Sequence, residues 1–590
     1  MLRAPRFFSW ISVAPLAALA LTWSRPAEAC GGTFCDNTLI PMPVDQTGED
    51  ILFIRDGADV EVHIRIQYMG EAERFAWIVP LQAIPEVAVG SELLFASLSQ
   101  ATAPFWYTNR SYDCPIDPTN AEGSDGGDFT GDTGVKFDAG GGPEIVFQDT
   151  VGSFDVIVLQ GGTAAEVIDF LTANDYAQDP EAEPILQEYL DEGFLFAAVK
   201  LAAAADVDQI HPLTFRFPGD EPCVPIRLTR IAAEQDMGIR VYLLGGERWV
   251  PSNYDHVVLN PLRYDWKNSP GIAGYVGLLS LAADEAGGQA FATDYAGPSS
   301  AVGTFGLWSP SWDENAFLGV DPIVAIDLIA EQGLNTHPLI RPLLMQYIPP
   351  PDGIEPIDFW NDIAAYADLI DLAAWDDVAF AAALSEQIIE PGLHAVDLLE
   401  TWPYLTRLNT TMSPVEMTLD PTFHVNGDLP DVPAQVASTA QVLCGDDEVY
   451  QVALAGSNAE VCVPSASAWP SFDMPAALRI EQMPMMGPAQ IVVDNQQAIL
   501  DALAAQQAGV ECQSVGDGDG DSGSGTADAT GGTGLEAGDE IADETETGPT
   551  YDLPYDTTCG CATSPDQAPL AIALGLLVFG WIVPRRARRS

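Results

Sequence analysis

Hydrophobic and polar residues alternate strictly near the start of the chain. Residues 60–68 read VEVHIRIQY, in which every second residue is apolar or aromatic and the residues between are polar. A period of two predicts a β-strand with one buried face. The apolar segments at 49–57 and 73–81 predict neighbouring strands, joined by turns at Asp56-Gly57 and Met69-Gly70. The pattern therefore predicts an antiparallel three-stranded meander.

The apolar period changes along the rest of the chain. The middle mixes both periods: helices are expected at 163–174 and 183–193, and strands at 154–160, 194–201, 211–217, 223–231 and 239–245. Helical spacing dominates from 321 to about 400, and short strands return at 448–456 and 478–483. We therefore predict an α+β fold with a β-rich N-terminal meander, a mixed α/β middle and a helical segment at about 321–400.

The N-terminus has the three parts of a secretory signal peptide. Arg3 and Arg6 form a basic start, an apolar stretch follows at 7–23, and Ala27-Glu28-Ala29 supplies the small residues that signal peptidase recognises. We expect cleavage after Ala29, which makes Cys30 the first residue of the exported protein.

The C-terminus combines a short apolar helix with a basic end. The run at 568–583 would cover about 24 Å as a helix, against a hydrocarbon layer of ~30 Å. Four arginines follow it and are expected to stay on the cytoplasmic side: Arg585, Arg586, Arg588 and Arg589. This pattern predicts a membrane helix, and it leaves everything before residue 559 outside the cytoplasm.

Composition separates the body of the chain from this tail. Residues 511–558 contain no basic residue and few large apolar groups, so they cannot bury enough surface to offset chain entropy. We expect a disordered acidic linker there. The predicted plan is a signal peptide at 1–29, an exported body at 30–510 with subdomains at about 30–115, 145–320 and 321–510, a linker at 511–558 and a sorting tail at 559–590.

The charge balance limits the classes of partner. The chain has 86 Asp and Glu against 23 Lys and Arg, and its formal net charge is −63. Such a surface repels nucleic acids and anionic lipids, so binding to polyanions is excluded. It favours solubility, multivalent cations or basic partners, and a generally solvated acidic surface is the simplest interpretation.

Cysteines are the main chemical groups that the sequence offers. Export to an oxidising compartment favours disulfides, and proximity in sequence predicts three of them: Cys30–Cys35, Cys444–Cys462 and Cys114–Cys223. Lipidation of Cys30 is the alternative, and it would exclude the first pair. A metal site at the first pair is disfavoured because no histidine lies nearby.

The sequence carries no recognised catalytic motif. Nucleophile elbows, phosphate-binding loops and the HExxH zinc motif are absent, and the six histidines are scattered without the spacing of paired ligands. We expect no cofactor. Asp517, Asp519 and Asp521 alternate as calcium ligands do, but Ser522 and Asp528 occupy positions where an EF-hand needs Gly and Glu. Only weak calcium association is expected there.

Two further patterns have alternative interpretations. Arg407 could pair with Glu416 or Asp420, whereas Ser413-Pro414 predicts a helix start with Ser413 as its cap. A set of aromatic residues could form a platform for sugars, although tryptophans lie more often in cores: Trp106, Tyr107, Trp308, Trp312, Trp360 and Trp402.

Several phrases of the body together resemble the bacterial family called domain of unknown function 2330. They are ACGGTFC at 29–35, HIRIQYMGEAERFAWIVPL at 63–81, and longer phrases at 170–201, 211–229 and 403–423. The resemblance implies export and a shared architecture, and it supplies no activity or catalytic residue.

The tail resembles the MYXO-CTERM sorting signal. Cys559-Gly560-Cys561, the hydrophobic helix and the arginine cluster follow one another in the order of that signal. The resemblance implies a processing protease that cleaves near Cys559 or Cys561 and leaves the protein attached at the cell surface. A permanent single-pass anchor is the alternative.

These observations favour a surface-anchored exported protein with a binding or structural role in the cell envelope. Its protein or polymer partner is not identified by the sequence. The alternative is an exported hydrolase that acts on envelope or extracellular polymer, because a catalytic site assembled from distant residues needs no sequence motif.

Overall fold

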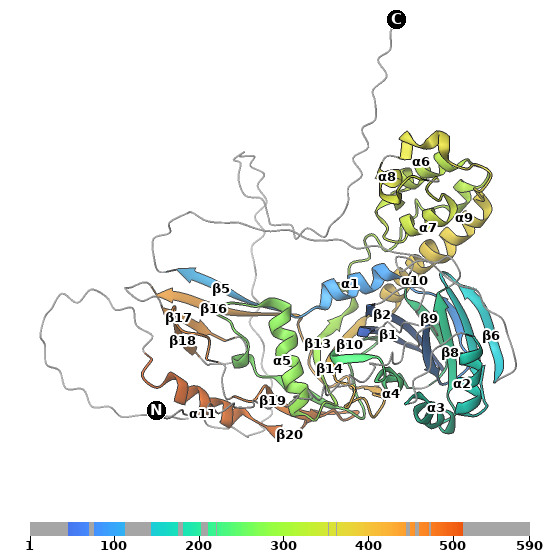
Figure 1. Ribbon diagram of the computed structural model, residues 1–590. Helices are drawn as coiled ribbons and strands as arrows, with labels where there is room; N and C mark the ends of the chain where they lie inside the picture. The colour runs from blue at the N-terminus through green and yellow to red at the C-terminus, as the bar shows by residue number, and fades with distance from the viewer. Residues whose placement is uncertain are drawn as a thin grey trace, which may run out of the picture. The chain divides into compact units, whose positions relative to one another are not determined.

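The computed structural model describes most of the body of the chain (Figure 1). The described residues are 45–69, 76–112, 143–174, 181–201, 210–219, 221–351, 353–361, 363–443, 449–454, 460–470 and 474–510. They belong to one compact unit and contain both strands and helices in abundance, with strands concentrated at the N-terminal end. The predicted α+β class is confirmed.

A ten-stranded mixed sheet forms the centre of this unit. β1 (Asp45–Asp56) and β2 (Asp59–Met69) make the predicted hairpin, and β1 also pairs in parallel with β10 (Ala233–Gly245). The strand order is β20 (Gln490–Asp494), β19 (Ala477–Gln482), β12 (Asp255–Leu259), β13 (Ala290–Pro298), β14 (Tyr404–Met412), β10, β1, β2, β9 (Leu213–Pro218) and β4 (Glu86–Val89). The sheet therefore contains strands from all three of the predicted subdomain ranges.

A second sheet packs on one face of the ten-stranded sheet. Its order is β3 (Ala76–Leu81), β8 (Leu195–Leu201), β7 (Phe154–Gln160) and β6 (Glu144–Val151). Val60 and Val62 of β2 share a core with Val156 and Val199 of this sheet. Its other face is covered by α2 (Ala164–Ala173) and α3 (Ala182–Asp191), which bury apolar residues against it.

Two helices cover the opposite face of the ten-stranded sheet. Apolar residues of α1 (Glu92–Thr102) and α10 (Glu390–Thr401) share a core with Leu52 and Ile54 of β1. As a result Glu61 and His63, on this face of β2, are 4% and 2% exposed. Both faces of β2 are therefore buried, and the prediction of one buried face is wrong.

The long connection from β13 to β14 contains the predicted helical segment. Its helices are α6 (Pro322–Gln332), α7 (Ile340–Tyr347), α8 (Pro356–Asn361), α9 (Asp377–Leu384), a π-helical turn at Ser385–Ile389, and α10. The helices α6 to α9 share an apolar core of their own, seen as the yellow-green group in Figure 1. This confirms the helical pattern at about 321–400.

A third sheet lies beside α5 (Gly271–Glu285). Its order is β18 (Glu460–Pro464), β17 (Val449–Ala453), β16 (Gln435–Leu443) and β5 (Phe105–Tyr112). One face of it shares a core with α5 and with α11 (Gln496–Gln507). A small two-stranded sheet joins β11 (Trp249–Pro251) to β15 (Phe423–Val425).

Three local predictions are corrected by these pairings. β3 pairs with β8 rather than with β2, and β9 is the second neighbour of β2. The predicted three-stranded meander therefore does not form. The segment predicted as a strand at 223–231 contains the short helix α4 (Ile226–Thr229). Ser413 begins a turn rather than a helix: its N–H donates to Glu416 Oε2 at 2.7 Å, and no helix follows within the next described residues.

Two of the cysteines predicted to form disulfides lie among the described residues. Cys223 carries a free thiol, so the predicted Cys114–Cys223 disulfide is wrong. Cys462 is disulfide-bonded. Its partner is not among the described residues, and the pair Cys444–Cys462 stays a prediction. Cys30, Cys35, Cys114 and Cys444 lie outside the described residues.

The predicted ends and linker also lie outside the described residues. They comprise the signal peptide at 1–29, the calcium candidate Asp517, Asp519 and Asp521, the Cys559-Gly560-Cys561 motif, the helix at 568–583 and the terminal arginines. Within the described part of the chain, no helix combines the length and apolar character needed to cross a bilayer.

Candidate metal centre

β2 carries two ligand-type side chains on its helix-covered face. Glu61 and His63 are two residues apart, and alternation along a strand places both on the same side. The neighbouring strand β9 aligns Arg216 with Glu61 and Thr214 with His63. Cross-strand partners in such a register face the same way, so four polar side chains meet over this part of the sheet.

α10 supplies a third ligand-type side chain, His394. The helix continues from α9 through the π-helical turn at Ser385–Ile389, a geometry that often marks functional sites. Gly392 allows a close approach at this end of α10, because a Cβ atom there would lie 2.2 Å from the carbonyl oxygen of Leu307. Ala395, directly after His394, and Leu398, one turn further on, are buried, which fixes the helix face that carries His394 over the sheet.

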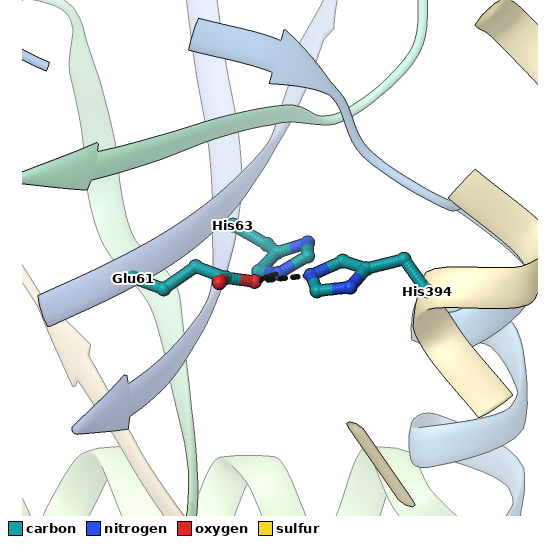
Figure 2. Close-up of side chains that lie close together, drawn as sticks. All are labelled: Glu61, His63 and His394. Atoms are coloured by element: carbon teal, nitrogen blue, oxygen red, sulfur yellow. Dashed lines mark hydrogen bonds and ion pairs between the residues drawn. The ribbon is translucent and has the colours of Figure 1, made fainter. Parts of the chain in front are cut away.

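Glu61, His63 and His394 converge on one point, and we call these three residues the metal centre (Figure 2). The Nε2 atoms of His63 and His394 lie 2.8 Å and 2.5 Å from Oε1 of Glu61. The two imidazole rings are stacked, with centroids 5.8 Å apart. The three ligand atoms all lie within 4.8 Å of one another, close enough to share one ion after a small adjustment.

The outer atoms of these side chains are also held in place. Arg216 Nη1 lies 3.3 Å from Oε2 of Glu61, and the Thr214 hydroxyl lies 3.0 Å from Nδ1 of His63. Metal ligands are typically oriented by such partners on their far side. The hydroxyl can donate to Nδ1 or accept from it, so it accommodates His63 whether or not Nε2 carries a proton.

The pKa shifts of the three side chains have different directions. Burial alone would raise the pKa of Glu61, but hydrogen bonds from His394 and His63 outweigh it and hold that pKa far below the usual value. Burial lowers the pKa of His63 despite its bond to Glu61, so its imidazole is neutral. Glu61 raises the pKa of His394, whose side chain is 44% exposed. The centre therefore combines a carboxylate and a neutral imidazole with a second imidazole that faces solvent.

The donor set indicates the kind of metal that fits. Two imidazole nitrogens and one carboxylate oxygen suit zinc and other divalent transition metals, whereas calcium and magnesium prefer oxygen ligands throughout. Three protein ligands leave at least one coordination position for water or substrate. An ion bound here would replace the shared hydrogen bonds at Oε1 of Glu61.

A buried ion-pair network holds the neighbouring part of β2. The Asp50 carboxylate on β1 is fully buried and is bonded by Arg65 of β2 and Arg240 of β10. Arg65 also reaches Glu92 at the start of α1, with an N–O distance of 2.6 Å. This network ties together β1, β2, β10 and α1, and it fixes β2 two residues away from His63.

The residues singled out in the sequence have other roles. Arg407 pairs with Asp294 at 3.0 Å rather than with Glu416 or Asp420, and Asp420 instead bonds Arg227 at 2.9 Å. The aromatic set is divided among separate cores, with Trp106 beside α5 and Trp308, Trp312 and Trp360 beside α6 to α9. No single platform contains them.

Sequence reasoning missed the metal centre. Glu61 and His394 are 333 positions apart, so no spacing motif connects them. The available signal was the pair Glu61 and His63 in an alternating strand, where a buried polar face would place two ligands together. Alternation alone predicts one buried face, and nothing in the spacing distinguishes His394 from the other scattered histidines.

Three comparisons with known proteins give one family match. A family model described as "Uncharacterized protein conserved in bacteria (DUF2330)" matches residues 26–308, a span that contains Glu61 and His63 and ends before His394. No curated protein matches the chain. A crystal structure of baculovirus P35 is similar over 37% of this chain and 75% of that chain, with 12% identity and a TM-score of 0.21. A similarity at that TM-score supports no inference about this protein.

Proposed function

Since the chain belongs to the DUF2330 family of bacterial proteins through residues 26–308, we propose that it is an exported cell-envelope protein that binds a divalent transition metal ion, with zinc as the expected ion. The sequence patterns predicted to be a signal peptide at 1–29 and a sorting tail at 559–590 support export and anchoring at the surface. Glu61, His63 and His394 are the proposed ligands.

One observation carries the metal-binding part of this proposal. Two imidazole nitrogens and a carboxylate oxygen from β2 and α10 lie within 4.8 Å of one another, and Glu61 and His63 are almost completely buried. Burying a carboxylate is costly unless it is paired, and here the charge is met by imidazoles and by Arg216. The convergence of an oriented carboxylate and two imidazoles is the arrangement that a transition metal requires.

Zinc titration of the full chain by calorimetry tests the metal site. We expect one bound ion per chain, and we expect His394→Ala to weaken its binding by roughly 100-fold, because loss of a ligand exceeds the 10–100-fold cost of losing an outer partner. His394 is the best position to change, since its side chain is 44% exposed and its removal leaves no large cavity. Thr214→Val is expected to weaken binding by about 10-fold through His63.

His424→Ala is the matched control for that titration. His424 is also partly exposed, and its Nδ1 lies 2.8 Å from the Ser252 hydroxyl at the separate two-stranded sheet of β11 and β15. This variant should bind zinc as the unmodified chain does. Absence of zinc binding, or equal binding by the unmodified chain and His394→Ala, would overturn the proposal.

A second candidate function is hydrolysis at the same centre. The specific observation in its favour is the ligand number, since three protein ligands and a partly exposed His394 leave room for a metal-bound water. In this case the zinc-loaded chain would release soluble fragments from isolated cell-envelope polymer, and His394→Ala would abolish the release. Zinc binding without any release favours the binding function.

Intact mass spectrometry of the protein purified from its native membrane fraction tests export and anchoring. We expect the mass of a chain that begins at Cys30 and ends near Cys559 or Cys561, because both terminal segments resemble processing signals. An added acyl mass on the N-terminal peptide would identify Cys30 as a lipid site. A full-length mass with unprocessed ends would contradict export.

A further inference from the structure

The sheet formed by β5, β16, β17 and β18 has two faces of different character. The inner face packs against α5, where Trp106 stacks on Trp266 with ring centroids 5.4 Å apart. The strand register places every second residue on the outer face. These residues are Phe105, Tyr107, Asn109, Ser111, Gln435, Ala437, Thr439, Gln441, Leu443, Val449, Gln451, Ala453, Glu460, Cys462 and Pro464. Val449 and Cys462 are buried, so the open part of the outer face is centred on β5 and β16.

An aromatic pair stands on the edge strand of this outer face. Phe105 is 55% exposed, and its ring stacks on that of Tyr107 with centroids 5.1 Å apart and an interplanar angle of 24°. Each ring restrains the other, so the pair forms a fixed apolar ridge at little further entropic cost on binding. Exposed aromatic residues in such a position are more typical of recognition than of stability.

Amides and hydroxyls surround this ridge. Asn109, Ser111, Gln435, Thr439 and Gln441 are all exposed on the same face. Amide side chains offer both donors and acceptors, and hydroxyls can do either. The outer face is therefore able to bond a ligand that presents many hydroxyl groups.

The outer face is almost free of charge, although the chain has a net charge of −63. Among its described residues Glu460 alone is charged, and its carboxylate accepts a 3.0 Å hydrogen bond from the Gln451 amide. A polyanion would find no basic residue there, and a basic protein would find its complement elsewhere on this acidic chain. The charge pattern thus matches a neutral ligand.

We propose that this outer face binds a neutral polysaccharide. The C–H faces of sugar rings would pack on Phe105 and Tyr107, and sugar hydroxyls would bond the amides across β16 and β17. The open part of the face spans β5, β16 and part of β17, and strands at about 4.8 Å spacing make it about 10 Å wide, enough for about two sugar rings. The site is separate from the metal centre and does not depend on it.

Retention of the full chain on insoluble cellulose and on chitin tests the proposal. We expect the unmodified chain to bind at least one of them and the double variant Phe105→Ala/Tyr107→Ala to bind at least 10-fold more weakly. Phe305→Ala is the matched control, because Phe305 is fully exposed outside this sheet. It should bind as the unmodified chain does.

Thr439→Arg gives a second test that does not depend on the aromatic pair. Thr439 is exposed in the middle of the outer face, so the substitution blocks the face without disturbing the core. It should also reduce retention by at least 10-fold. Failure of the unmodified chain to bind either polysaccharide would overturn the proposal. Retention of both face variants at the level of the unmodified chain would overturn it as well. A dimer in solution that the face variants abolish would also overturn the proposal, because the face would then bind a second copy of the chain.

Discussion

Replacing Asp50 by alanine is expected to lower the free energy of unfolding by about 3 kcal/mol, because it leaves two arginines in a buried network without their shared carboxylate. The Asp50 side chain is fully buried, whereas Arg65 and Arg240 are 20% and 25% exposed. Burial raises the pKa of Asp50, but Arg240 and Arg65 outweigh it and hold that pKa below its usual value. Urea denaturation at neutral pH measures the change as a shift in midpoint.

Asp56→Ala is the matched control for the same chemistry at the surface. Asp56 pairs with Arg216 at 2.9 Å, but its side chain is 56% exposed and solvent screens the interaction. We expect a loss of less than about 1 kcal/mol. Equal losses in the two variants would show that the Asp50 network does not hold β1, β2 and β10 together.

Because Arg65 is two residues from His63, Asp50→Ala should weaken zinc binding as well.

Acidification from pH 6.5 to pH 4 is expected to remove about 3 kcal/mol of stability through His211 alone. His211 is 4% exposed, its Nε2 accepts from the Ser153 N–H at 3.0 Å, and its Nδ1 donates to the Pro212 carbonyl at 2.9 Å. Both bonds suit a neutral ring, and burial lowers the pKa of His211 to about 4. The bond from Ser153 connects the turn between β6 and β7 to the residues just before β9.

The direction of this effect follows from proton counts. In the unfolded chain His211 binds a proton near pH 6.5, whereas in the folded chain it does so only near pH 4. Between these values the unfolded state holds more protons, so stability decreases as the pH decreases. Above about pH 6.5 both states are neutral at this residue, and it contributes no pH dependence.

His211→Gln removes this titration and tests it. Equilibrium denaturation at several pH values should show a slope between pH 6.5 and 4 that is smaller than that of the unmodified chain by up to about 1.4 kcal/mol per pH unit. Burial also lowers the pKa of His63, His256 and His337, so the variant should keep part of the acid sensitivity. Phe305→Ala, which changes an exposed residue outside the Ser153 turn and removes no titratable group, should keep the full slope. Identical slopes in all three proteins would contradict the assignment.

Several local predictions succeeded because the signal lay within one element. The strand at 154–160 matches β7, and the helix expected at 163–174 matches α2, whose Thr163 and Glu166 form a reciprocal cap. By contrast, the segment at 223–231 has a strand-like composition but contains α4, where the Arg227 N–H bonds Asp420 at 3.0 Å. A partner 193 positions away overrode the local preference.

By itself the sequence determined the α+β class, the β1–β2 hairpin and the helical segment before β14, since each depends on a repeat that neighbouring residues define. It also determined the acidity of the chain and the predictions for its two ends. Only the tertiary structure decided that the polar face of β2 is buried, that β3 joins another sheet and that His394 meets Glu61 and His63. Alternation gives the polarity of a face and not what covers it. That cover is α10, which reaches β2 only after the chain has folded over more than three hundred residues.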